Sequence, residues 1–239
     1  RQRQMCIRDR LYGCAQTVTV AEITPKRSLE FDIAIADGGA TVGEMAQRTK
    51  ALVGINGSYF GMNKRSAITY LRQGRTVLDT TTTAELALRV TGAIRTHGRK
   101  LRIMPWNKEI ERRYHCRHGS TLASGHLLLY RGQSILLRSS SMGFVVKKHP
   151  RSAIALTSRG TVLFVTVDGR HPGYAGGMNL IELRHFLQQL GCTDAINLDG
   201  GGSTTLWAKG FSTNGVANYP CDNRKFDHDG ERKVANAVV

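Results

Sequence analysis

The stretch Ala195-Ile-Asn-Leu-Asp-Gly-Gly-Gly-Ser-Thr-Thr205 is the starting point for predicting the fold of this chain. A short apolar strand runs into three consecutive glycines, with the Asp199 carboxyl before them and the Ser203 and Thr204 hydroxyls after them. Successive backbone N–H groups in such a turn form a concave anion site. Three glycines cost more conformational entropy than a tight turn requires. The stretch therefore indicates a functional loop at the end of a strand.

Apolar and alternating runs on both sides of the loop predict a chain rich in strands. The predicted strands are 17–24, 31–36, 51–55, 66–71, 85–90, 122–130, 133–137, 152–156, 161–167, 195–198 and 205–208. Residues 37–40 are predicted to form a turn, 158–160 the turn of a hairpin, and 100–118 a basic, irregular excursion over the surface.

Two capping boxes predict helices. One opens at Thr41 with Glu44 and runs through Arg48, and the other opens at Asn179 with Glu182 and carries a stripe of leucines. No internal repeat or low-complexity linker divides the chain. The predicted fold is α+β, a single domain with a mixed, largely antiparallel β-sheet and a few packed helices.

The charge of the chain is unusual for its size. Its 239 residues carry a formal charge of +16, with a pI near 10.2. Such a balance favours anionic partners, namely phosphates, nucleic acid, acidic glycans or a membrane surface. No helix-turn-helix, aromatic RNA-binding strand or zinc finger is visible, so we expect no specific nucleic-acid partner. No run of 18 apolar residues is present, so no transmembrane segment is expected.

The first residues have a character of their own. The opening RQRQMCIRDR resembles translated sequencing adapter, and its four arginines and one aspartate supply 4 − 1 = +3 of the charge. We expect residues 1–16 to be a non-native or processed segment and residues 17–239 to form the domain. Leu11-Tyr-Gly-Cys14 resembles the end of a bacterial lipoprotein signal. The expected location is therefore outside the cytoplasm, periplasmic or secreted, with a lipid anchor at Cys14 as an alternative.

The five cysteines show no C-x-x-C spacing and have no neighbouring histidine pair, so no zinc site is expected. Their odd number and irregular spacing argue against a disulfide framework, with a single bridge such as Cys116–Cys221 as an alternative. No cofactor is predicted, and no sequence pattern supports a divalent cation.

Three predicted strand ends carry polar clusters: Asn56 to Tyr59, Asp168-Gly-Arg170 and Asp199 to Thr204. If these strands are neighbours in one sheet, two carboxylates and an arginine converge beside the anion-binding loop. An arginine fork recognises phosphate through two hydrogen bonds. Paired carboxylates suit cleavage of a sugar C1–O bond. Arg151, which precedes a strand, would add a second phosphate contact or be a solvated surface charge.

The chain resembles the phosphodiester glycosidase family, the bacterial relatives of the lysosomal uncovering enzyme. The matching stretches are residues 54–60, 124–125 with 127–132, 150–154, 164–170, 177–183, 195–204 and 231–236. They run in the family's order from about residue 50 to the C-terminus. The chain departs from the family pattern at Ala155, His126 and Lys233, and none of these changes removes a polar group from the predicted site.

The resemblance implies a mixed α/β domain that hydrolyses a sugar-1-phosphodiester, GlcNAc-1-phosphodiester-like, to free sugar and phosphomonoester. Asp199 or Asp168 would act as base or nucleophile, and Glu182 is a third catalytic candidate that capping alone also explains. The predicted substrate- and phosphate-binding residues are Asn56, Tyr59, Arg151, Arg170, Asn197, Gly200, Gly201, Gly202, Ser203, Thr204 and Asn236. The alternative function is a non-catalytic binding protein for an anionic glycan, cell-wall polymer or exopolysaccharide.

Overall fold

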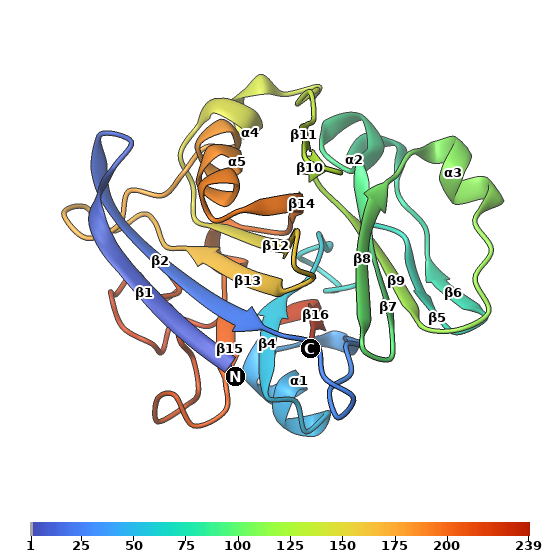
Figure 1. The fold of residues 1–239 in the computed structure, drawn as a ribbon, viewed down its shortest axis with the longest axis horizontal. Coiled ribbons are helices and arrows are strands. Elements are labelled where there is room, and N and C mark those ends of the chain that lie inside the picture. Colours follow the sequence, from blue (N-terminus) through green and yellow to red (C-terminus); the bar gives the residue numbers. More distant parts are fainter. Residues whose placement is uncertain (1) are drawn as a thin grey trace.

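The computed structural model of the chain contains three β-sheets and five short α-helices in the residues that it describes (Figure 1). It describes the backbone of residues 2–239 and the side chains of residues 6–239, so that Arg1 of the N-terminal segment lies outside the described part. Within it, every pairing of neighbouring strands is antiparallel. The predicted α+β class and its largely antiparallel sheet are confirmed.

The largest sheet has seven strands in the order β1-β2-β13-β12-β14-β10-β11. Its strands are β1 (Gln2–Leu11), β2 (Cys14–Ile23), β10 (Leu127–Tyr130), β11 (Gln133–Ser134), β12 (Arg151–Thr157), β13 (Val162–Val167) and β14 (Cys192–Asn197). The predicted hairpin is confirmed, because Arg151 pairs with Val167 and Leu156 with Val162. The N-terminal segment forms the edge strand β1 against β2.

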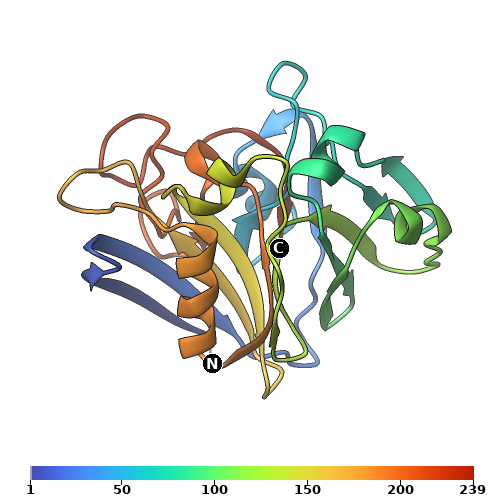
Figure 2. The same cartoon turned by 90° about the horizontal axis from the view of Figure 1, so that it is seen from above.

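Helix α5 (Leu180–Gln189) covers one face of this sheet, next to the short helix α4 (Met142–Val146) (Figure 2). The predicted capping box is present, since the Asn179 side chain accepts from the Glu182 N–H and the Glu182 carboxylate accepts from the Asn179 N–H. Leu183 and Leu187 are fully buried on the face that the leucine stripe predicts.

The second sheet has the order β15-β4-β16-β3 and carries helix α1 (Val42–Arg48), whose capping box between Thr41 and Glu44 is also confirmed. Its strands are β3 (Ile33–Ala40), β4 (Val53–Asn56), β15 (Leu206–Ala208) and β16 (Val234–Val238). The first two sheets pack against one another through apolar side chains, including Ile55 from β4 and Ile154 and Phe164 from the large sheet.

The third sheet has the order β6-β5-β9-β7-β8 and lies beside β10, with helices α2 (Thr83–Leu88) and α3 (Lys108–Arg113) at its end (Figure 1). Its strands are β5 (Leu71–Gln73), β6 (Thr76–Asp79), β7 (Gly92–His97), β8 (Lys100–Pro105) and β9 (Ser120–Ser124). Ile94 and Leu122 extend the common core into this sheet.

Several predicted elements in this region are wrong. Residues 85–90 lie mainly in a helix, since the Thr82 side chain caps α2 and Glu85 pairs with Arg89 one turn on. Residues 100–118 form β8 and α3 instead of an irregular excursion. The predicted strand 122–130 is two strands interrupted at Gly125, and 66–71 pairs in β5 only from Leu71 onward.

Two smaller features also differ from expectation. The Gly38-Gly39 pair, predicted as a turn, lies inside β3 at positive φ, where the register with β16 shifts. The alternative bridge between Cys116 and Cys221 is absent, since both thiols are free. No helix within residues 2–239 is long and apolar enough to cross a membrane.

Candidate functional site

The three glycines follow β14 and form a single 3₁₀ turn, Gly201–Ser203. Gly201 has a φ of +63°, in the left-handed region that favours glycine. A Cβ on Gly202 would lie 2.3 Å from a guanidinium nitrogen of Arg232 and 2.5 Å from an Asp222 carboxylate oxygen. The loop is therefore rich in glycine because charged side chains pack directly onto its backbone.

Asp199 lies at the rim of this loop and is partly exposed. Its carboxylate accepts a hydrogen bond from the Gly200 N–H at 2.9 Å. Burial raises the pKa of Asp199, and the Ser203 hydroxyl and the Arg89 charge oppose this rise. A partly exposed carboxylate whose surroundings solvate it poorly is a common position for a general base or nucleophile.

Asn56, at the end of β4, holds the glycine loop in place through hydrogen bonds to the residues on either side of it. Its amide nitrogen donates to the Asp199 carbonyl at 2.8 Å. Its side-chain oxygen accepts from the Ser152 hydroxyl at 2.6 Å and from the Thr205 N–H at 3.1 Å. Asn56 is completely buried and joins the seven-stranded and four-stranded sheets at the site.

Tyr59 and Asn197 meet in a second buried polar cluster next to the loop. The Asn197 amide donates to the Tyr59 hydroxyl at 3.1 Å and to the Gly125 carbonyl at 2.8 Å. The Tyr59 hydroxyl donates to the same carbonyl. Burial raises the pKa of Tyr59, and the Arg89 guanidinium, 3.6 Å from the centre of the ring, opposes it.

Basic side chains surround the glycine loop. Arg170 is exposed, and one of its guanidinium nitrogens lies 3.0 Å from the position that a Gly201 Cβ would occupy. Arg232 forms an ion pair with Asp222 over Gly202. Arg170 was predicted for this role, whereas Arg232 and Arg89 were missed. Arg232 stands inside the C-terminal family stretch, which is the one sequence feature that could have indicated it.

Asp168 is connected to the loop through Asn218. One oxygen of its carboxylate accepts from the Asn218 amide at 2.8 Å and from the Tyr219 N–H at 3.1 Å. The Asn218 amide also donates to the Thr204 carbonyl at 3.1 Å. Asp168 is 1% exposed, and its burial raises the pKa to about 7. It therefore lies behind the loop, whereas Asp199 lies at its rim.

Two predicted site residues, Arg151 and Glu182, are engaged by neighbouring backbone groups and side chains. Arg151 is buried and donates to the Met178 and Phe144 carbonyls at 3.0 and 2.9 Å, and burial lowers its pKa to about 10. It is therefore not the solvated surface charge given as the alternative. Glu182 caps α5 and pairs with Lys148 at 2.7 Å. No hydrogen bond joins Glu182 to the glycine loop among the described residues, and its catalytic role stays a prediction.

Several buried polar atoms near the loop have no hydrogen-bond partner within the described part of the protein. They include the hydroxyl of Thr204 and the amide nitrogen of Asn236, whose oxygen accepts from the Ser58 N–H at 2.8 Å. Buried polar groups of native proteins are usually paired. This concentration of unused donors supports a polar ligand at the loop. Among residues 6–239, no group of three or more metal-binding side chains gathers.

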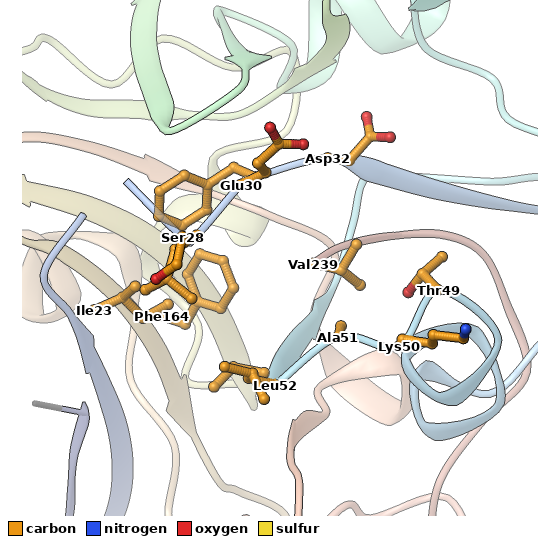
Figure 3. A pocket seen from close by; sticks show the side chains of 13 residues that line it. Ile23, Ser28, Glu30, Asp32, Thr49, Lys50, Ala51, Leu52, Phe164 and Val239 are labelled. Atoms are coloured by element: carbon orange, nitrogen blue, oxygen red, sulfur yellow. The ribbon is translucent and has the colours of Figure 1, made fainter. Parts of the chain in front are cut away.

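A separate hollow of about 350 Å³ lies at the opposite end of β4 from Asn56 (Figure 3). Val53, at the start of β4, lines it together with Phe164, Glu30 and Lys50. None of the predicted site residues lies in its wall. The site proposed from the sequence is therefore the glycine loop with its carboxylates and arginines, and this hollow is a different feature.

The aligned regions of the curated relatives span less than a quarter of those proteins' own length. N-acetylglucosamine-1-phosphodiester alpha-N-acetylglucosaminidase of Mus musculus is 36% identical over 80 residues, 34% of this chain and 14% of that protein. The enzyme of the same name from Bos taurus is 32% identical over 115 residues, 43% and 21% respectively. The SPbeta prophage-derived uncharacterized protein YomE of Bacillus subtilis is 37% identical over 70 residues, 29% of this chain and 11% of that protein.

Two solved structures share the fold. The catalytic domain of zebrafish N-acetylglucosamine-1-phosphodiester alpha-N-acetylglucosaminidase superposes with a TM-score of 0.70 at 20% identity, over 100% of this chain and 81% of that one. A hypothetical protein from Synechocystis superposes with a TM-score of 0.67 at 17% identity, over 99% and 61%. The family described as phosphodiester glycosidase matches residues 49–239, most of the chain, and confirms the expected family. The chain belongs to the phosphodiester glycosidase family.

Proposed function

We propose that this chain hydrolyses a sugar-1-phosphodiester, GlcNAc-1-phosphodiester-like, to the free sugar and a phosphomonoester. The observation that carries the proposal is the position of Asp199 on the rim of a three-glycine loop against which two arginines, Arg170 and Arg232, pack. A carboxylate beside a phosphate-binding surface is the arrangement that such a substrate requires. The names of the mammalian relatives support the same substrate class.

The chemistry follows from the leaving group. The C1–O bond breaks, its electron pair leaves with the phosphate, and water supplies the new hydroxyl oxygen at the sugar C1. A phosphomonoester is a far weaker base than a sugar alkoxide, so little help from a general acid is needed. Stabilising the negative charge matters more, and Arg170 with the loop N–H groups is placed to do this.

The positive charge that develops on the sugar is opposed by a carboxylate. Asp199 either removes a proton from the attacking water, or attacks C1 itself and forms a glycosyl ester that water then hydrolyses. Asp168, with its pKa raised to about 7, would hold a proton over part of the neutral range and contact the loop through Asn218. The alternative function is a non-catalytic binding protein for an anionic glycan, in which the same loop holds a phosphate without turnover.

Release of GlcNAc from a GlcNAc-α-1-phosphodiester by the purified chain tests the proposal. The Asp199→Asn variant should release no sugar above background while retaining the ligand. Asp194→Asn is the matched control, since Asp194 lies inside β14, three residues before the strand ends at Asn197, whereas Asp199 follows the strand. If neither the wild type nor the control releases sugar from a panel of sugar-1-phosphodiesters, but both bind them, the binding function is correct.

A further inference from the structure

The outer face of the five-stranded sheet carries a row of basic side chains that the proposed reaction does not use. Arg102 of β8 stands directly opposite Arg95 of β7. Arg95 in turn opposes Thr121 of β9, which opposes Arg72 of β5. Directly opposed residues project from the same face of a sheet. Ile94, the neighbour of Arg95, points into the core, so the row lies on the other side.

Three segments form this surface, which we call the basic sheet face: residues 72–75, 95–102 and 112–118. They carry nine Lys or Arg residues and no Asp or Glu, and one of the nine, Arg113, pairs with Glu109 just outside them at 3.3 Å. The segments meet in space, since His97 and His118 stack with ring centres 5.9 Å apart. A shallow hollow of about 130 Å³ is lined by Arg95, His97, Lys100 and Arg102. The surface therefore combines high positive charge with a concave centre.

The charges of the basic sheet face destabilise the folded protein when no anionic partner is bound. Like charges directly opposite one another destabilise an antiparallel pair, and Arg95 and Arg102 are such a pair. The Nε of Arg95 is buried and has no hydrogen-bond partner in the described part of the chain. The Arg72 guanidinium, by contrast, is buried and donates to backbone carbonyls, one of them Gly74 at 3.0 Å. Arg72 therefore contributes positive charge while backbone carbonyls hold its guanidinium. No hydrogen bond or ion pair within the described residues engages the side chains of Arg95 and Arg102.

We propose that the basic sheet face binds a linear polyanion whose units are joined by phosphodiesters, a glycan or polyol-phosphate chain, and that it anchors the polymeric substrate of the glycine loop. The second part rests on the proposed function. Arginine forks bind phosphate oxygens in pairs. A row of such side chains across adjacent strands complements a chain of phosphates.

The surface lacks the features of a nucleic-acid platform. Proteins that bind single strands stack successive bases on aromatic rings. Tyr114 is the sole Phe, Tyr or Trp in the three segments. It packs edge-on against Trp106, 5.0 Å between ring centres, and its hydroxyl bonds that of Thr121 at 3.0 Å. A phosphodiester polymer without bases is the better match.

The basic sheet face is distal to the glycine loop. Strand β7 starts at Gly92, opposite Ser124, and the carbonyl of the next residue, Gly125, accepts from the Asn197 amide at the site. The strand ends at His97, about 17 Å away at 3.3 Å per residue. Arg95 lies three residues from Gly92, about 10 Å at the same rise, so a single sugar-1-phosphodiester at the loop would leave most of this surface free, whereas a chain of several repeats spans both.

Binding of unsubstituted poly(glycerol phosphate) tests the first part, because it offers no glycosidic bond to hydrolyse. The double variant Arg95→Gln/Arg102→Gln should bind at least tenfold more weakly than the wild type. The slope of log K against log salt should fall by about 1.4, from about 0.7 for each lost phosphate contact. The matched control is Arg48→Gln/Lys209→Gln, which loses the same charge from exposed positions in the four-stranded-sheet layer and should bind like the wild type.

Two comparisons make the binding result decisive. An oligothymidylate with the same number of phosphates should bind more weakly than poly(glycerol phosphate), and equal or tighter binding would overturn the choice of partner, as would binding to anionic phospholipid vesicles alone. An equal loss in the control pair would show non-specific charge attraction. The unfolding temperature of the Arg95/Arg102 variant should be unchanged or higher, since a repulsive pair is removed.

Hydrolysis separates this inference from the proposed function. On a short GlcNAc-1-phosphodiester, the Arg95/Arg102 variant should match the wild type in kcat and KM. On a long polymer that carries the same bond, its KM should rise at least tenfold with kcat unchanged. An unchanged KM on the polymer contradicts the anchoring role. Failure of the wild type on the short substrate contradicts the proposed function instead, while polyanion binding would still stand or fall by its own measurement.

Discussion

The Asn56 amide donates a 2.8 Å hydrogen bond to the backbone carbonyl of Asp199. This contact joins the end of β4 in the second sheet to the end of β14 in the first, across 143 residues of sequence. The position of the candidate catalytic carboxylate therefore depends on how the two sheets pack, and not on the glycine loop alone.

Replacing Asn56 with Ala should destabilise the protein and displace the loop. The change leaves the Asp199 carbonyl, the Thr205 N–H and the Ser152 hydroxyl without their partner in a buried place. Each such group costs about 1–3 kcal/mol, so the loss should be roughly 3 kcal/mol or more. Urea unfolding measures it, with exposed Asn63→Ala as the control, expected within about 0.5 kcal/mol of wild type. A loss as small as that of the control would contradict this role.

Replacing Asp168 with Asn should change how stability depends on pH. Burial raises the pKa of Asp168 to about 7, from a usual value of 3.8, so the folded state binds a proton that the unfolded state has released. The wild type should therefore lose stability as pH rises from about 4 to about 7, by up to about 4 kcal/mol at 1.4 kcal/mol per pKa unit. The variant, which has no carboxyl to ionise, should lack this loss.

The free energy of unfolding of both proteins between pH 4 and pH 8 measures the effect. The advantage of Asp168→Asn over the wild type should grow across this range and level off above pH 7. A difference between Asp168→Asn and the wild type that is the same at every pH would argue against a buried, protonated Asp168.

Replacing Gly202 with Ala should impair turnover. The added methyl would lie 2.3 Å from the Arg232 guanidinium, so Arg232 and its partner Asp222 would have to move. Overpacking of this kind costs about 1–3 kcal/mol. Because the displaced Arg232 would no longer face the loop as in the wild type, we expect kcat/KM to fall by about 10-fold or more, a loss of about 1.4 kcal/mol of transition-state stabilisation.

Gly143→Ala in α4 is the matched control, because the nearest atom to its added Cβ would lie 3.8 Å away. It should retain full activity. If Gly202→Ala is as active as this control, then the contact between Arg232 and the loop does not contribute to the reaction.

Elements set by local sequence were predicted well. The capping boxes at Thr41 and Asn179 fix α1 and α5 through contacts three residues apart. The prediction of a strand at helix α2 is wrong, because a run of apolar residues this short fits the period of a strand as well as that of a helix. The contact that favours the helix is the salt bridge between Glu85 and Arg89, four residues apart. In β8 the buried Leu101 and Ile103 alternate with basic side chains, and the density of charge obscured the strand.

The candidate site was predicted in part. The polar strand ends at Asn56, Asp168 and Asp199 are linked in the structure, through Asn218 in the case of Asp168. Arg89 could not be predicted, because its place over the Tyr59 ring depends on how the third sheet packs against the second. The catalytic and binding roles of these residues stay predictions until variants are measured.

The central claim is that the chain breaks the bond between the sugar C1 and the phosphate oxygen. Hydrolysis of a GlcNAc-α-1-phosphodiester in ¹⁸O-labelled water, followed by mass spectrometry of both products, tests it most directly. The account predicts that the label appears in the released sugar and that Asp199→Asn releases neither product. Label in the phosphomonoester would show that the P–O bond is broken and would contradict the account.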